Sequence, residues 1–274
     1  MTEGMSPTGP GADTVARFSD RADDYVKYRP SYPAAAIDAI LDGLGASSQV
    51  RAADIGAGTG ISARLLADRG VHVVAIEPGA QMRAAATSHT RVLWVAATAE
   101  ATGLDDGSLD LIQCAQSFHW FRPAPTLAEF ARVLVPGGRL VLMWNRRSTT
   151  DALTAGYRQA ILDVGGEVAA ERMAFEPEVV IASGLFTAPE RLTFPNAQPL
   201  DLEGLIGRAR SASYVPKDGP AGEELIARLR RLHAEHADAN GVVTLVYETE
   251  IYRSSRYRPG GGHGTTGFSG VSAT

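Results

Sequence analysis

The sequence Asp-Ile-Gly-Ala-Gly-Thr-Gly at residues 54–60 is the segment whose residue types and spacing most clearly suggest chemistry. Glycines at this spacing let the backbone turn tightly and approach a ligand, and the helix that follows supplies free N–H donors. We therefore expect Gly56, Ala57 and Gly58 to present backbone to a bound molecule. Asp54 ends an apolar run and is costly to bury without a partner, so we expect it to orient the loop or, through water, an ammonium group.

Two further positions narrow the identity of the ligand. A dinucleotide-binding fingerprint requires glycine at the sixth position of GxGxxG, and this chain has Ile61 there, which disfavours NAD. Glu77 follows the next apolar run, about twenty residues further on, where a carboxylate can bind two ribose hydroxyls. Glu77 suits both NAD and S-adenosylmethionine, so it indicates a nucleoside ligand without choosing between them.

The elements that must position these residues alternate along the chain. Apolar, β-branched runs predict strands, and amphipathic or alanine-rich runs predict helices. The predicted strands cover 50–55, 71–76, 91–95, 110–114 and 139–144, and the predicted helices cover 61–69, 79–86 and 125–134. This alternation predicts an α/β fold: a Rossmann-like, seven-stranded, mostly parallel sheet with helices on both faces.

The pattern changes after residue 145. Residues 150–185 look helical, 191–194 form a short strand, 202–211 and 223–236 are helices, and 242–252 read as an antiparallel edge strand that closes the sheet. We expect one domain over 16–255, with a helical cap at approximately 148–187 and part of 200–238. The flanking segments 1–15 and 256–274 are rich in Gly, Pro, Ser or Thr and are expected to be disordered.

These blocks together resemble class I S-adenosylmethionine-dependent methyltransferases. The glycine-rich segment is similar to their first motif, AIEP at 75–78 to their second, and LVPGGRLVLMWN at 134–145 to their fifth-strand block. More narrowly, the chain resembles the small-molecule group that includes trans-aconitate methyltransferase. That likeness rests on Tyr28-Arg29-Pro30 with the residues around it, and on the block Glu203–Tyr214.

The resemblance implies S-adenosyl-L-methionine as cofactor and S-adenosyl-L-homocysteine as product. Arg29 and Tyr25 can clamp its carboxylate, although an arginine on a solvated helix is nearly as compatible with the sequence. Glu77 would hold the ribose, and Met82 would flank the adenine unless it is ordinary core packing. The complete set of expected cofactor contacts is Tyr25, Arg29, Asp54, Gly56, Ala57, Gly58, Glu77, Pro78, Met82, Ala99, Glu100, Gln116 and Ser117.

Methyl transfer from a sulfonium is an in-line displacement, so positioning and exclusion of water can supply most of the catalysis. A base is needed only when the acceptor must lose a proton of high pKa; a carboxylate acceptor needs none. His119, in the loop after the fourth predicted strand, is the candidate base, with a packing role as the alternative. Tyr28 and Tyr214 are candidates to face the acceptor.

Composition restricts the partners. A net charge of −5, without a basic stripe, gives no reason to expect nucleic acid. No apolar stretch approaches a membrane span and the first residues lack a signal-peptide pattern, so we expect a cytoplasmic enzyme with a small-molecule substrate. His233 and His236 are expected on a solvated helix face, and we predict no metal. The sequence leaves open the oligomeric state, a non-methylating catalyst such as a cyclase on the same fold, and a nucleoside-sensing module without turnover.

Overall fold

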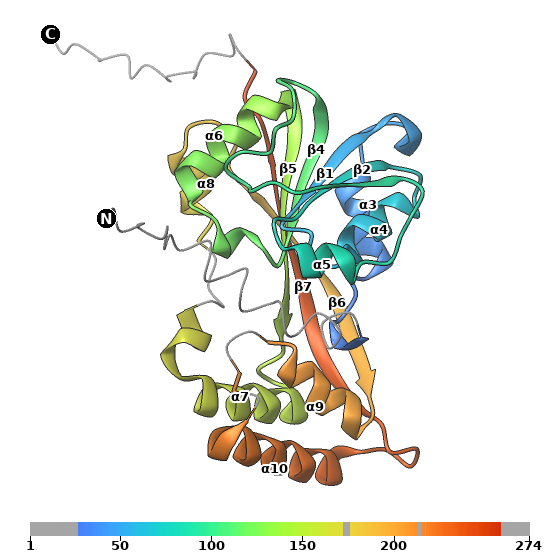
Figure 1. Ribbon diagram of the computed structural model, residues 1–274, viewed down its shortest axis with the longest axis vertical. Helices are drawn as coiled ribbons and strands as arrows, with labels where there is room; N and C mark the ends of the chain where they lie inside the picture. Colours follow the sequence, from blue (N-terminus) through green and yellow to red (C-terminus); the bar gives the residue numbers. More distant parts are fainter. Residues whose placement is uncertain (1–26, 172–175, 213–214, 217, 259–274) are drawn as a thin grey trace, which may run out of the picture.

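The computed structural model describes residues 27–171, 176–212, 215–216 and 218–258, with side chains from 165 to 171 excepted. Its centre is a seven-stranded sheet in the order β3-β2-β1-β4-β5-β7-β6 (Figure 1). The strands are β1 Arg51–Ile55, β2 His72–Ile76, β3 Val92–Val95, β4 Leu109–Ala115, β5 Leu134–Arg147, β6 Glu190–Leu200 and β7 Val243–Ser255. The first five pair in parallel, as the alternation of strands and helices predicts.

The antiparallel part of the sheet differs from the prediction in two respects. β7 was expected at the edge, but it pairs with both β5 and β6, and β6 forms the edge. β6 is also longer than the predicted 191–194, because it pairs with β7 from Glu190 to Leu200. Pro195 and Pro199 interrupt its sequence pattern, and an edge strand tolerates proline since one side of its backbone needs no partner.

Helices cover both faces of the sheet. The α-helices are α3 Ala34–Leu41, α4 Ile61–Ala67, α5 Ala80–Ala84, α6 Pro123–Val133, α7 Ala152–Glu171, α8 Glu178–Ala182, α9 Leu202–Arg210 and α10 Gly219–His236. The cluster that contains Ile37, Ile40 and Leu66 packs α3 and α4 on one face. Phe130 and Val180 bring α6 and α8 to the other face (Figure 1). The fold is therefore the predicted three-layer α/β arrangement, with α3 as an additional helix.

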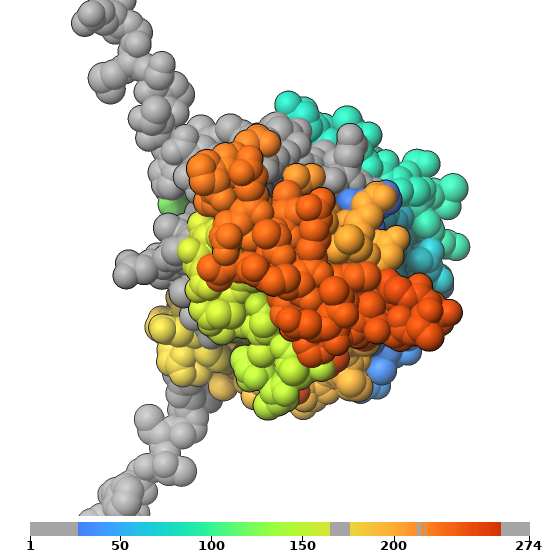
Figure 2. Space-filling view, turned by 90° about the horizontal axis from the view of Figure 1, so that it is seen from below, coloured from blue at the N-terminus to red at the C-terminus, as the bar shows by residue number. Residues whose placement is uncertain are grey.

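A third hydrophobic cluster lies beyond the carboxyl ends of the central strands. Tyr157 of α7, Leu205 of α9 and Leu229 of α10 pack there against the extended ends of β6 and β7. Figure 2 shows α7 and α10 side by side over this end of the molecule. α8 does not join them, although the cap was expected to reach about residue 187; its Val180 belongs to the core beside α6. We call α7, α9 and α10 the cap; that they cover a substrate stays a prediction.

Within the described residues, no helix combines the length and the apolar character needed to cross a membrane.

Candidate functional site

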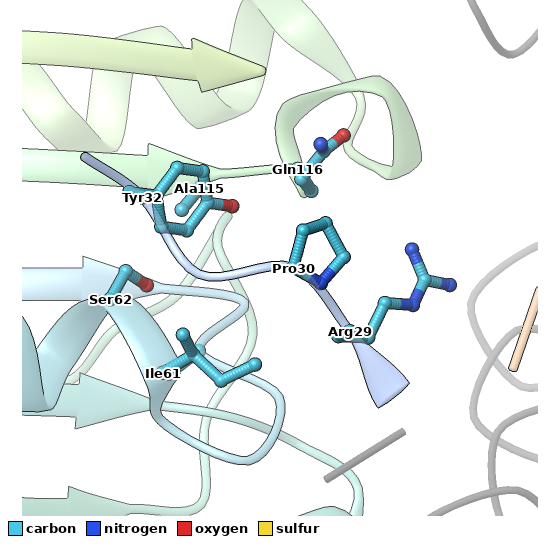
Figure 3. Close-up of a pocket in the computed structure, with 8 residues that line it drawn as sticks. Arg29, Pro30, Tyr32, Ile61, Ser62, Ala115 and Gln116 are labelled. Carbon is cyan, nitrogen blue, oxygen red and sulfur yellow. The ribbon is translucent and has the colours of Figure 1, made fainter. Parts of the chain in front are cut away.

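A pocket opens where the strand order reverses, between β1 and β4. In open α/β sheets this switch point, at the carboxyl ends of the strands, is where ligands bind. The empty volume is about 360 Å³ including the part open to solvent. Its lining consists of Arg29, Pro30, Tyr32, Ala57, Ile61, Ser62, Ala115 and Gln116 (Figure 3). Ala57, Arg29 and Gln116 were expected cofactor contacts, and all three face this one pocket.

The glycine-rich loop forms one wall of the pocket. Gly56 and Gly58 adopt φ values of 67° and 58°, which L-residues with side chains rarely adopt. A Cβ on Gly56 would lie 2.7 Å from the Cβ of Ser117 and 2.9 Å from the Phe121 ring. Gly56 is therefore required twice, for backbone conformation and for close approach to the loop that follows β4.

Glu77 fastens the glycine-rich loop to the end of β2. Its two carboxylate oxygens accept hydrogen bonds from the backbone N–H groups of Gly58 (2.9 Å) and Gly79 (2.7 Å). Burial raises the pKa of Glu77, and these two hydrogen bonds and Arg83 oppose that rise. The carboxylate is thus held rigidly beside the loop, with further lone pairs available for hydroxyl donors.

The loop after β4 forms the opposite wall. Gln116 has φ 58°, and no other non-glycine residue of the described ranges has positive φ. Its N–H donates to the carbonyl of Met143 at 2.8 Å, which holds the residue in place. The hydroxyl of Ser117 donates to the carbonyl of Ile55 at 2.6 Å and ties this loop to β1. Such strain is typical of functional sites, and here it places Gln116 in the pocket.

Asp54 lies beneath the pocket and is fully buried. Its Oδ2 accepts a hydrogen bond from the Ser62 hydroxyl at 2.6 Å, whereas Oδ1 has no partner among the described residues. Burial raises the pKa of Asp54 to about 7, against the hydrogen bonds that favour the ionised form. This hydrogen bond joins Asp54 to the helix that follows the glycine-rich loop, and its role in orienting the loop or, through water, an ammonium group stays a prediction.

The raised pKa of Asp54 gives a pH-dependent stability. The folded chain binds the Asp54 proton more tightly than the unfolded chain does. The free energy of unfolding therefore falls as the pH rises from about 4 to about 7, and Asp54 adds no further pH dependence above that range. Asp54→Asn removes this cost and keeps an acceptor for Ser62. We expect the Tm of wild type to fall relative to Asp54→Asn across that pH window, measured by thermal unfolding without ligand. A difference that is independent of pH would contradict the assignment.

The segment before α3 connects the pocket to the cap. Arg29 donates from Nη2 to the carbonyl of Ser211, just after α9, at 2.9 Å. Tyr28 donates its hydroxyl to Glu203 at 2.6 Å, and its ring packs directly on Gly207 of α9. The structure therefore places Tyr28 against α9 and not along the pocket lining, although it was a candidate to face the acceptor. Tyr25 and Tyr214 lie outside the described residues.

The other expected contacts divide into two groups. Met82 is buried and its side chain lies near Gly79, close to Glu77. Pro78 is exposed beside them. Ala99 belongs to the hydrophobic core next to the sheet, and Glu100 accepts hydrogen bonds from Arg122. Met82 and Pro78 thus surround Glu77, while Ala99 and Glu100 lie on the segment between β3 and β4.

His119 is joined to the core through Trp144. It lies in the 3₁₀ turn Phe118–Trp120, and its Nδ1 accepts a hydrogen bond from the indole N–H of Trp144 at 3.4 Å. An indole nitrogen only donates, so the neutral imidazole carries its proton on Nε2. In this tautomer His119 donates a hydrogen bond through Nε2. Nε2 can accept a proton only if the ring proton is on Nδ1 instead, and that tautomer would lose the hydrogen bond from Trp144.

Five pocket residues were not among the expected contacts: Pro30, Tyr32, Ile61, Ser62 and Ala115. Ile61 and Ser62 begin α4 directly after the glycine-rich loop. Their position next to this motif was the feature of the sequence from which their place in the pocket could have been predicted. Pro30 and Tyr32 belong to the N-terminal segment on which the family resemblance rests. Within the described ranges, no group of three or more His, Cys, Asp or Glu residues is arranged to hold a metal ion.

Comparison with known proteins agrees with this geometry. A family model described as a methyltransferase domain matches residues 53–142, which include the glycine-rich loop, Glu77 and Gln116. An uncharacterized methyltransferase of Mycobacterium tuberculosis is 34% identical over 253 residues, covering 89% of this chain and 97% of the relative. The chain belongs to the class I S-adenosylmethionine-dependent methyltransferases.

Solved methyltransferases share the fold at low sequence identity. A structure from Anaeromyxobacter dehalogenans, assigned as a type II methyltransferase, has a TM-score of 0.59 and 23% identity, with 84% of this chain and 98% of that chain covered. The geranyl diphosphate C-methyltransferase of Streptomyces coelicolor has a TM-score of 0.51 and 13% identity, covering 92% and 100%. The chain therefore shares its sheet and helix layers with both of these solved structures.

Proposed function

We propose that this methyltransferase acts in the cytoplasm on a small-molecule metabolite, as a relative of the trans-aconitate methyltransferase-like group. The observation that carries the proposal is the Glu77 carboxylate, which is fixed by Gly58 and Gly79 beside a pocket at the switch point of the sheet. S-adenosylhomocysteine is bound in the Streptomyces fold neighbour, which supports the same cofactor here.

The residues present fit S-adenosylmethionine. Glu77 offers an acceptor for ribose hydroxyls, and Ala57 and Gln116 present backbone and amide groups to the methionine part. Arg29 brings a cation to the same pocket for the carboxylate. When bound, the cofactor supplies a methyl group on a positively charged sulfur. The chain's own contribution is to hold both reactants in line and to exclude water.

The cap and the loop after β4 provide the acceptor side. α7, α9 and α10 stand beyond the carboxyl ends of the strands (Figure 1), and the pocket-lining Ala57 and Gln116 follow the carboxyl ends of β1 and β4. His119 lies in that loop and, with its proton on Nε2, donates a hydrogen bond to an oxygen or nitrogen of the acceptor. This role orients the acceptor without requiring a general base.

The role of His119 can be tested with a pair of substitutions. In His119→Gln the amide nitrogen replaces the Nε2–H donor, whereas His119→Ala removes it. We expect His119→Gln to keep kcat/KM within about tenfold of wild type, and His119→Ala to lose roughly 10- to 100-fold, as for loss of one hydrogen bond in a site. Equal losses in both variants, together with loss of the acidic limb of the pH–rate profile, would identify a general base instead.

The proposed activity is tested by transfer of label. Purified enzyme is incubated with S-adenosylmethionine carrying a labelled methyl group and a pool of small metabolites, and labelled products are sought by mass spectrometry. We expect a labelled product and stoichiometric S-adenosylhomocysteine. A product that forms without label, and equally with S-adenosylhomocysteine in place of the donor, would instead support a cyclase or other non-methylating catalyst.

A further inference from the structure

The segment that brings Arg29 and Pro30 to the pocket cannot fix its own position through regular structure. Pro30 and Pro33 have no N–H, and each disfavours helical backbone in the residue before it, so the chain is extended up to the start of α3. Figure 3 shows Pro30 between Ile61 of α4 and Gln116 after β4. The contacts that hold this segment therefore determine where Arg29 lies in the pocket.

Side-chain amides from the antiparallel half of the sheet hold the backbone of this segment. Gln198 of β6 donates from Nε2 to the carbonyl of Tyr28 at 2.9 Å. Asn196 of β6 and Asn145 of β5 donate from Nδ2 to the carbonyl of Ser31, at 2.9 and 3.2 Å. We call these three side chains the amide clamp. The two carbonyls lie on either side of the pocket-lining pair in the sequence, so the clamp fixes the backbone at both ends of that pair.

The orientation of the two asparagines in the clamp follows from their other partners. Thr249 of β7 donates its hydroxyl to Oδ1 of Asn145, and Asn196 also donates to that oxygen, at 3.1 Å. Oδ1 of Asn196 accepts from the N–H of Ala197 at 2.9 Å. Both amide oxygens are therefore occupied by donors, which leaves the amide nitrogens to face Ser31.

The sequence of β6 changes where the strand meets this segment. Leu192 and Phe194 pack toward the core from one face of β6, and the alternation places Asn196 and Gln198 at the next two positions of that face. Inward positions of an antiparallel strand are normally apolar. The two amides depart from that pattern at the positions where carbonyls of another segment need donors.

We propose that the amide clamp positions Arg29 for the amino-acid part of the cofactor. Among the described residues, the pocket lining includes Arg29 and none of the three amides, so the clamp acts through the two carbonyls. Arg29 also donates to the carbonyl of Ser211, which anchors its guanidinium to the cap while the clamp anchors its backbone to the sheet. The inference rests on the assignment of this pocket to S-adenosylmethionine. It adds that the edge strand β6 controls affinity from outside the pocket.

The first arm of the test measures ligand binding by calorimetry. Asn196→Leu removes a donor to Ser31, adds no charge and continues the apolar alternation of β6. We expect it to weaken S-adenosylhomocysteine binding by roughly 3- to 30-fold, and to change binding of 5′-methylthioadenosine, which lacks the amino-acid part, by less than about twofold. Gln198→Leu removes the donor to Tyr28 and should act in the same direction. The matched control is Asn240→Leu, at an exposed turn before β7, which should bind both ligands as wild type does.

The second arm tests whether the clamp acts through Arg29. Arg29→Gln removes the guanidinium, so adding Asn196→Leu to it should weaken S-adenosylhomocysteine binding by less than about twofold further. Three results would each overturn the proposal: unchanged S-adenosylhomocysteine binding in both clamp variants, equal losses for the two ligands, or a loss that adds in full to that of Arg29→Gln.

Amide hydrogen exchange without ligand separates this inference from the cofactor assignment. In Asn196→Leu and Gln198→Leu, the N–H groups of residues 28–32 should exchange roughly tenfold faster than in wild type, because a hydrogen bond that holds the segment is lost. Asn240→Leu should exchange as wild type does, and unchanged exchange in both clamp variants would overturn the inference. Faster exchange in a protein that binds no S-adenosylhomocysteine would leave the clamp standing and refute the cofactor assignment alone.

Discussion

Glu77→Ala is expected to weaken S-adenosylhomocysteine binding by about 100-fold or more. The change removes the carboxylate that would accept two ribose hydroxyls, and charge-assisted hydrogen bonds each contribute about 1.5–3 kcal/mol. It also leaves the N–H groups of Gly58 and Gly79 without their carboxylate acceptor, so the loop loses its attachment to β2. Calorimetric titration with S-adenosylhomocysteine measures the loss, and thermal unfolding shows whether the variant is folded.

Two comparisons make the Glu77 result specific. 5′-Methylthioadenosine keeps the ribose but lacks the amino-acid part, so its binding should fall by a similar factor in Glu77→Ala. Wild-type affinity should also decline as the pH is lowered through the raised pKa of Glu77, because a protonated carboxyl is a poorer acceptor for the two hydroxyls. If Glu77→Ala binds both ligands as wild type does, Glu77 has only a structural role in the loop.

Gly56→Ala is expected to destabilise the fold and to abolish cofactor binding. The new methyl group would lie 2.7 Å from the Cβ of Ser117, which cannot move freely because its hydroxyl is bonded to Ile55. Left-handed backbone costs alanine about 1–2 kcal/mol, and overpacking adds about 1–3 kcal/mol. The loop can relieve the clash only by moving away from the pocket, so S-adenosylhomocysteine binding should be lost together with stability.

Gly45→Ala is the matched control for this experiment. Gly45 has φ 86°, and a Cβ there would meet nothing within 4 Å. It therefore carries the backbone strain of Gly56→Ala without the clash, and we expect about 1–2 kcal/mol of destabilisation with normal ligand affinity. Equal unfolding free energies and equal affinities in the two variants would show that the contact between Gly56 and Ser117 is unimportant.

The part of the site that follows from local pattern was predictable from the sequence. β1 and β2 pair in register from Arg51 with His72 to Ile55 with Ile76, so the glycine-rich loop and Glu77 leave the sheet at the same level. Two adjacent parallel strands with a loop and an acid at their carboxyl ends were enough to expect their proximity. α3 was also within reach, since Pro33 precedes a helical pattern with Ile37 and Ile40 on one face.

Contacts between distant segments were not predictable in this way. Tyr28 donates to Glu203, 175 residues away, and no local pattern links the two. β7 lies inside the sheet because β6 pairs with it along its whole length. The prolines of β6 interrupt the strand pattern, so the sequence did not predict this long partner. Arg208 looked like one of many arginines in the sequence. It is nonetheless buried in the structure, next to Gly207 where α9 packs against Tyr28, and no local pattern predicts this burial.

The central claim is tested most directly by calorimetric titration of wild-type protein with S-adenosylmethionine, S-adenosylhomocysteine and NAD. We predict micromolar binding of both sulfur ligands at one site per chain and no binding of NAD, because Ile61 stands where a dinucleotide site needs glycine. Absence of binding by both sulfur ligands, or preferential binding of NAD, would contradict the assignment of this pocket to S-adenosylmethionine.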